Sequence, residues 1–80
     1  MSDIERRRLA WMCRRGMREL DVVLSAFLEQ RYGRADSGQK AAFRRLLECQ
    51  DPLIFAYLTG REEPPDAPTR ALLRALRGDT

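Results

Sequence analysis

The stretch from Met17 to Tyr32 constrains the fold more than any other part of the chain. Apolar residues recur there every three to four positions, which is the spacing of one face of an α-helix. These positions are Leu20, Val23, Leu24, Phe27, Leu28 and Tyr32. The stripe predicts an amphipathic helix whose apolar face other elements must cover, and Gly33 is a natural C-terminal cap for it.

Glycine, proline and capping residues divide the rest of the chain into four more helical segments. Ser2 with Glu5 forms one capping-box pair, and Asp36 with Gln39 forms another. Asp51 precedes a proline and predicts an N-cap. The four segments are 2 to about 14, 37 to about 49, 51–60 and 66–77. Nowhere do β-branched and polar residues alternate over the length of a strand. The sequence therefore predicts an all-α fold, a compact antiparallel five-helix bundle that forms one domain over 1–80.

The first segment has two apolar faces that differ in character. Leu9, Met12 and Cys13 share one of them, while Ile4 and Trp11 share the other with Arg8. A lone tryptophan in a small domain is more often a core residue than a contact residue, although tryptophan is enriched at binding hot spots. The core positions expected in the later segments are Phe43, Leu46, Leu47, Leu53, Ile54, Tyr57, Leu58, Leu72, Leu73 and Leu76.

Composition argues against an enzyme. A chain of 80 residues builds a small core, and this one has no histidine to serve as general base or metal ligand. Cys13 and Cys49 lack the paired spacing of a zinc site, and we interpret both as reduced, buried or half-buried thiols. No apolar run approaches the roughly 20 residues of a membrane span, and the first residues lack the apolar region of a secretory signal. We therefore expect a soluble cytoplasmic protein.

The net charge of +3 comes from the first half of the chain, where nine basic residues face six acidic ones. A small basic helical protein is a candidate for nucleic-acid binding. However, acids are interleaved with the arginines, and the clearest helix presents a mostly apolar stripe without a polar reading face. We therefore predict no nucleic-acid partner, and we keep this function only as a less favoured alternative.

The sequence CRRGMRELD allows two interpretations. If Gly16 separates two helices, Glu19 and Asp21 lie in the first turns of the second helix, where its dipole favours acids. Arg14 and Arg15 then end the first helix, where cations are favoured. If the helix is nearly continuous, Arg15 and Glu19 lie on one face with bare backbone at Gly16 between them. The second arrangement is typical of a surface that a partner approaches closely.

This stretch also resembles a known motif. RRGMRELD is similar to the RGxxE motif of the succinate dehydrogenase assembly factor family, the flavinylation factors of bacteria and mitochondria. In this sequence the motif is Arg15, Gly16 and Glu19. The later blocks LLECQDP and LIFAYLTG occur in the order and spacing of the family. The resemblance covers about residues 4–60.

The resemblance implies a five-helix accessory protein, not a classical enzyme. Members bind the flavoprotein subunit of succinate dehydrogenase, or of fumarate reductase in bacteria, and promote covalent attachment of FAD to a histidine of that client. It implies a client-binding surface in which Arg15 pairs with an acid or carbonyl, Glu19 pairs with a basic or amide group, and Gly16 permits close approach. Possible rim residues are Arg8, Trp11, Arg14, Met17, Arg18 and Asp21.

Other expectations concern cofactors and partners. The chain has no glycine-rich phosphate loop, so we expect FAD to belong to the client and to bind this chain weakly or not at all. We expect a monomer. An antitoxin-type protein-binding role is the main alternative, because members of the family have also carried that label and the same surface could serve it.

Overall fold

The computed structural model describes residues 2–78, and the part of the chain from Ser2 to Gly78 contains helices and no strand. The predicted all-α class is therefore confirmed. Met1 and residues 79–80 of the predicted domain lie outside the described residues. The elements are α1 (Asp3–Met12), α2 (Arg18–Gln30), the short 3₁₀ helix η1 (Tyr32–Arg34), α3 (Ser37–Leu47), α4 (Asp51–Leu58) and α5 (Ala67–Arg77).

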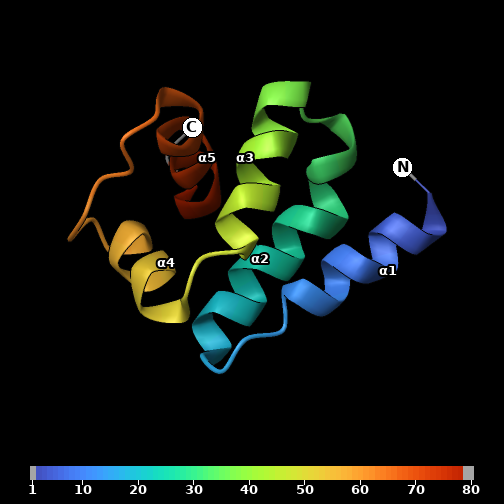
Figure 1. Ribbon diagram of the computed structural model, residues 1–80, viewed down its shortest axis with the longest axis horizontal. Coiled ribbons are helices and arrows are strands. Elements are labelled where there is room, and N and C mark those ends of the chain that lie inside the picture. The colour runs from blue at the N-terminus through green and yellow to red at the C-terminus, as the bar shows by residue number, and fades with distance from the viewer. Residues whose placement is uncertain (1, 79–80) are drawn as a thin grey trace.

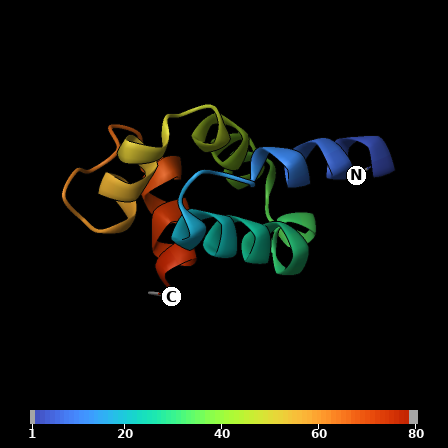
Figure 2. The same cartoon turned by 90° about the horizontal axis from the view of Figure 1, so that it is seen from below.

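Helices α1, α4 and α5 pack against the pair formed by α2 and α3. Helix α2 contacts α1, α4 and α5, and α3 packs against α5. Helices α1 and α2 run antiparallel, as predicted, whereas α5 crosses α3 (Figures 1 and 2). The bundle is thus less regular than predicted, because the proline-containing loop after α4 redirects the chain before α5 begins. The radius of gyration is 11.6 Å, close to the roughly 12 Å expected of a compact chain of this length.

Side-chain caps begin three of the helices as the sequence predicts. Ser2 accepts a hydrogen bond from the backbone N–H of Glu5, at 3.1 Å. Asp36 accepts one from the N–H of Gln39, at 2.7 Å, and Asp66 caps α5 in the same way. These bonds satisfy N–H groups that have no partner within their own helix.

Several predicted helix boundaries differ in the structure. Helix α1 ends at Met12 instead of near Arg14. The chain leaves the helix there, and the Arg15 side chain turns back to donate to the carbonyl of Met12. Helix α2 ends at Gln30, and Gly33 lies within η1 instead of capping α2. Asp51 is the first residue of α4 and not its N-cap, since its carboxylate bonds to the chain between α1 and α2.

The core forms where the apolar stripe of α2 meets α3 and α5. Phe43 lies at its centre, with ring centroids 4.8 Å from Phe27 and 5.5 Å from Tyr32. The Tyr32 hydroxyl accepts a hydrogen bond from Arg44, which satisfies its polar atom. Most predicted core positions are confirmed as buried, namely Leu9, Cys13, Leu20, Leu24, Phe27, Leu28, Tyr32, Phe43, Leu46, Leu47, Ile54, Leu72 and Leu73.

Several apolar side chains stay outside this core. Trp11 is 71% exposed and Ile4 is 79% exposed, so the expectation of a core tryptophan was wrong. The reason is the small contact face of α1, which buries Leu9 and leaves the opposite face to solvent. Among residues 2–78, no helix is long and apolar enough to cross a membrane.

The two cysteines are free thiols in different environments. Cys13 is completely buried and Cys49 is half-buried, as predicted. Burial raises the pKa of the Cys13 thiol to about 11. At pH 8 only about one Cys13 in a thousand would then be the reactive thiolate.

We predict that a thiol reagent such as Ellman's reagent modifies the native protein at Cys49 and modifies Cys13 only after denaturation. The count should rise from one thiol per chain at pH 8 to two in urea, because unfolding removes the burial of Cys13. A Cys49→Ser variant serves as control and should show almost no native reaction. Rapid native labelling of that variant would contradict the buried position of Cys13.

Candidate functional site

The linker between α1 and α2 is fixed by the side chain of Arg15. Its Nε donates to Asp51 Oδ1 at 2.8 Å. One terminal nitrogen donates to the carbonyls of Met12, at 2.8 Å, and Leu47, at 2.9 Å, and the other donates to Cys49, at 2.6 Å. The Arg15 side chain is only 14% exposed. Its guanidinium thus donates hydrogen bonds to four acceptors within the chain.

Three of the four acceptors around Arg15 belong to helix ends, and the fourth, the carbonyl of Cys49, lies in the chain between α3 and α4. Met12 is the last residue of α1 and Leu47 the last residue of α3, so their carbonyls have no partner within their own helices. The C-terminal end of a helix also carries a partial negative charge that favours a cation. Asp51 begins α4. One guanidinium therefore joins the ends of three helices, and its planar fork suits several acceptors at once.

Two aspartates complete this anchor by binding the linker backbone. The second carboxylate oxygen of Asp51 accepts the N–H of Gly16 at 3.0 Å. Asp21, in the first turns of α2, accepts the N–H of Arg15. The hydrogen bond from Arg15, with a smaller contribution from the Gly16 N–H, holds the pKa of Asp51 below its ordinary value of 3.8. The linker is therefore held from both α2 and α4.

Gly16 lies on the surface of this fixed linker, and the fold itself does not require glycine there. A Cβ at this position would lie 3.6 Å from Asp51 Oδ2, which is an ordinary van der Waals contact. Its φ is not positive, unlike the φ of Gly60 and Gly78, so another residue could adopt the same backbone. The bare backbone at Gly16 is thus available to something outside the chain.

Glu19 stands beside this bare backbone with its carboxylate in solvent. It lies in the first turn of α2, where the helix dipole favours an acid. It is exposed, and none of residues 2–78 forms an ion pair or side-chain hydrogen bond with it. On the other side of the linker, the Arg14 guanidinium lies 5.8 Å from the ring centre of exposed Trp11. Arg8 and Arg18 are also exposed.

The structure separates the predicted site residues into two groups. Gly16, Glu19, Arg8, Trp11, Arg14 and Arg18 face solvent, and we call them the exposed set. Arg15 and Asp21 hold the linker, and Met17 is half-buried against the core. Arg15 and Glu19 do not share one helix, because α2 begins at Arg18. The guanidinium of Arg15, which was expected to pair with an acid or carbonyl of a client, is already bound to Asp51.

Sequence reasoning missed the partners of Arg15. Asp51 is 36 positions away from it, and an acid before proline at a helix start is the ordinary pattern of an N-cap. The other acceptors are main-chain carbonyls, so the side chains of Leu47 and Cys49 carry no signal of this role. The partners of Arg15 could not be predicted because Asp51 is distant in the sequence and the other acceptors are backbone atoms.

The exposed set has the features of a contact surface. Among residues 2–78, no group of three or more histidine, cysteine or acidic side chains could hold a metal ion. What the exposed set offers is a rigid backbone segment, one free carboxylate, several arginines and an exposed indole. These features are common at protein–protein contacts, where tryptophan and arginine are enriched.

We predict that stability depends on the Arg15–Asp51 pair in a pH-dependent way. Because the folded-state pKa of Asp51 is depressed, its carboxylate stabilises the fold above about pH 4, and this contribution is lost as the pH falls through the folded value. Asp51→Asn should be less stable at pH 7 and should lose less stability in acid. Urea unfolding followed by circular dichroism at pH 7 and between pH 4.5 and 2.5 measures both effects.

Two further variants make this measurement specific. Arg15→Lys keeps the charge but has three N–H donors for the four acceptors. It therefore loses at least one bond to a carbonyl, which should lower the free energy of unfolding at pH 7 by about 1.5–3 kcal/mol. The pKa of Asp66 is also lowered, mainly by its hydrogen bond with Thr69, so Asp51→Asn should retain part of the acid dependence. An acid dependence identical to that of the wild type would contradict the role of Asp51.

The sequence was then compared with known proteins. A family profile described as "Flavinator of succinate dehydrogenase" matches residues 7–80. The chain is 44% identical over 70 residues to a protein of Idiomarina loihiensis named FAD assembly factor SdhE. This alignment covers 88% of the chain and 78% of that protein. The match to the protein of the same name in Pseudomonas aeruginosa is 43% identical over 75 residues and covers 94% and 89%.

A third relative of that name, in Methylococcus capsulatus, is 45% identical over 73 residues, covering 91% of this chain and 88% of its own length. The three alignments therefore span at least 88% of this chain and at least 78% of each relative. The family profile includes the anchored linker, Glu19 and all helices after α1. On this basis the chain belongs to the family of flavinators of succinate dehydrogenase.

Proposed function

We propose that this chain is an assembly factor that binds the flavoprotein subunit of succinate dehydrogenase and promotes covalent attachment of FAD to it. Membership of the flavinator family and relatives named FAD assembly factor support this function. The observation that carries the proposal is the bare backbone at Gly16, fixed by Arg15 and Asp51 and flanked by the unpaired carboxylate of Glu19.

The chain acts by binding and not by supplying a reactive group. It has no histidine, and its buried Cys13 thiol has a raised pKa. The bond forms between a histidine of the client and the client's own FAD. A rigid surface that holds the client in a reactive arrangement lowers the entropic part of the barrier. The internal bonds of Arg15 suit this role because they order the linker before the client arrives.

Individual residues have distinct tasks in this proposal. Gly16 allows the client backbone to approach closely, and Glu19 accepts hydrogen bonds from a basic or amide group of the client. Arg15 contributes by holding the linker, since its guanidinium is engaged internally. The rest of the exposed set surrounds this centre, where the stacked Trp11 and Arg14 add apolar and cationic contact.

The finer points of the proposal concern setting and partners. We infer that the chain works as a monomer in the cytoplasm and has no nucleic-acid partner. We also infer that the flavoprotein subunit of fumarate reductase is a second client of the same surface. Capture from the native organism separates this role from an antitoxin role: flavoprotein subunits support the proposal, and a membrane-linked toxin would contradict it.

We predict that Gly16→Arg and Glu19→Ala remain folded but fail to promote flavinylation. Arginine at position 16 would block close approach, and alanine at position 19 removes the carboxylate. The measurement mixes purified variant, apo flavoprotein and FAD and follows covalent flavin by in-gel fluorescence. Each variant should slow incorporation about tenfold or more, the size typical of a contact hot spot.

Matched controls test whether the position matters and not merely the substitution. Gly33→Arg places the same side chain at another exposed glycine, where a Cβ meets nothing within 4 Å. Glu29→Ala removes an exposed carboxylate farther along α2. Both controls should behave as the wild type. If folded Gly16→Arg promotes flavinylation at the wild-type rate, the surface is wrongly placed.

We also predict that the isolated chain does not bind FAD tightly. Its glycines are dispersed at positions 16, 33, 38, 60 and 78 instead of forming a phosphate-binding loop. Isothermal titration of FAD into the purified chain should show no binding at micromolar concentration. Saturable binding in that range would overturn the assignment of FAD to the client alone.

A further inference from the structure

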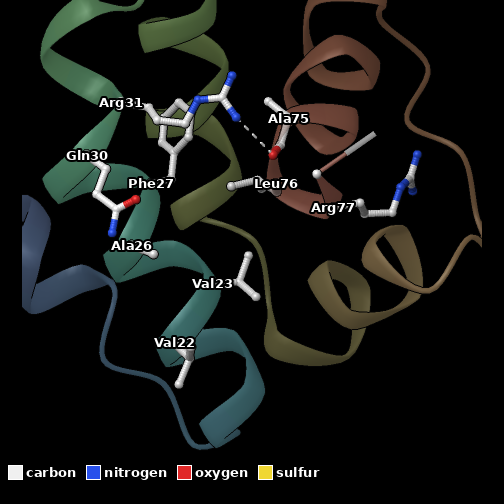
Figure 3. A pocket seen from close by; sticks show the side chains of 10 residues that line it. Val22, Val23, Ala26, Phe27, Gln30, Arg31, Ala75, Leu76 and Arg77 are labelled. Carbon is white, nitrogen blue, oxygen red and sulfur yellow. Dashed lines mark hydrogen bonds between the residues drawn. The ribbon is translucent and has the colours of Figure 1, made fainter. Parts of the chain in front are cut away.

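A groove of about 320 Å³ lies between α2 and α5, and none of its lining residues belongs to the exposed set. Val22, Val23 and Ala26 of α2 form one wall, and Leu76 of α5 forms part of the other (Figure 3). Val22 is 61% exposed and lies beside half-buried Val23 and Ala26, so apolar side chains adjoin one another on this open face. The groove is thus apolar along its middle and open to solvent.

The groove begins at Val22, about one helical turn beyond Glu19 on α2. On α2, Glu19, Val22, Ala26 and Gln30 are separated by three or four residues, so they follow one line along the helix surface. At 1.5 Å per residue this line is about 17 Å long, which is the length of roughly five residues of extended chain. A partner that contacts Glu19 can therefore continue into the groove without leaving this face of α2.

Opposite charges lie at the two ends of α2, beside this line. Glu19 supplies a carboxylate at the start of α2, and Arg31 supplies a guanidinium at its end. Arg31 reaches across the groove and donates one N–H to the carbonyl of Ala75 at 3.3 Å (Figure 3). Arg77 also lines the groove, but its side chain points away from α2 toward α4, where it donates an N–H to the carbonyl of Tyr57 (Figure 3). Exposed Arg31 thus remains the cation that faces an occupant.

We propose that this groove is a second client-binding subsite, which receives a segment of the flavoprotein subunit carrying a donor group, an apolar side chain and a carboxylate in that order. The donor meets Glu19, the apolar side chain covers Val22 and Ala26, and the carboxylate pairs with Arg31. This inference rests on the proposed function, because continuity with the Gly16–Glu19 surface identifies the occupant as the same client.

The test measures the affinity of purified variants for the apo flavoprotein subunit of succinate dehydrogenase. Val22→Glu and Arg31→Glu should each weaken binding about tenfold or more, because one puts a charge in the apolar strip and the other reverses the charge that meets the carboxylate. Both positions are exposed, so circular dichroism and thermal unfolding should stay close to those of the wild type.

Arg34→Glu and Ala67→Glu are the matched controls. Arg34 is an exposed arginine near Arg31 that also donates to one backbone carbonyl, and it does not line the groove. Ala67 is exposed at the start of α5, outside the groove. Both controls should bind the client within twofold of the wild type. Equal losses in the controls would mean that net charge, and not the groove, governs binding, and would overturn the inference.

The remaining outcomes separate this inference from the proposed function. If Gly16→Arg abolishes binding while Val22→Glu and Arg31→Glu bind as the wild type does, the groove is no subsite and the proposed function stands. If the wild type itself does not bind the client, both fail. A photo-crosslinking residue at Val22 should capture a client peptide that contains aspartate or glutamate, whereas capture of a second copy of this chain would overturn the proposal.

Discussion

The bonds of the Arg15 guanidinium organise the rest of this structure. A domain of 80 residues has a small core, and α1 adds little to it, since only Leu9 of that helix is buried. The end of α1 is held instead by a cation that also binds the last carbonyl of α3 and the first residue of α4. Because these acceptors are helix ends, the same bonds satisfy groups that would otherwise lack partners. Three helices and one linker are thereby fixed by a single side chain.

In the proposed function, this anchor lets one short motif serve two tasks. The arginine of the motif is turned inward, while Gly16 and Glu19 are turned outward on the segment that it holds. A loop ordered in advance loses less conformational entropy when a partner binds, which is the general advantage of preorganisation. Arg15 and Asp51 would thus contribute to client binding without touching the client. The groove beyond Glu19 extends the same logic, since α2 supplies both surfaces from one rigid helix.

The sequence predicted most of the fold because its strongest signals are local. The stripe on α2 and the capping side chains Ser2, Asp36 and Asp66 were confirmed, since each depends on neighbours within one or two turns. Helix ends were less predictable. Helix α1 ends at Met12 and α2 ends at Gln30 for reasons of tertiary packing, which outweighs the preference for glycine at a helix end. The crossing of α5 over α3 is likewise a property of the assembled chain.

The sequence by itself determined the all-α class, the absence of histidine chemistry and the motif residues Arg15, Gly16 and Glu19, because composition, periodicity and short motifs are properties of local chain. Tertiary structure alone decided which of these residues face solvent and which are bonded within the fold. It brought Asp51 to Arg15 across 36 positions and left Trp11 and Val22 in solvent. The physical reason is that the acceptors of a guanidinium can be carbonyls at distant helix ends, whose positions depend on the packing of whole helices and not on the identity of any nearby side chain.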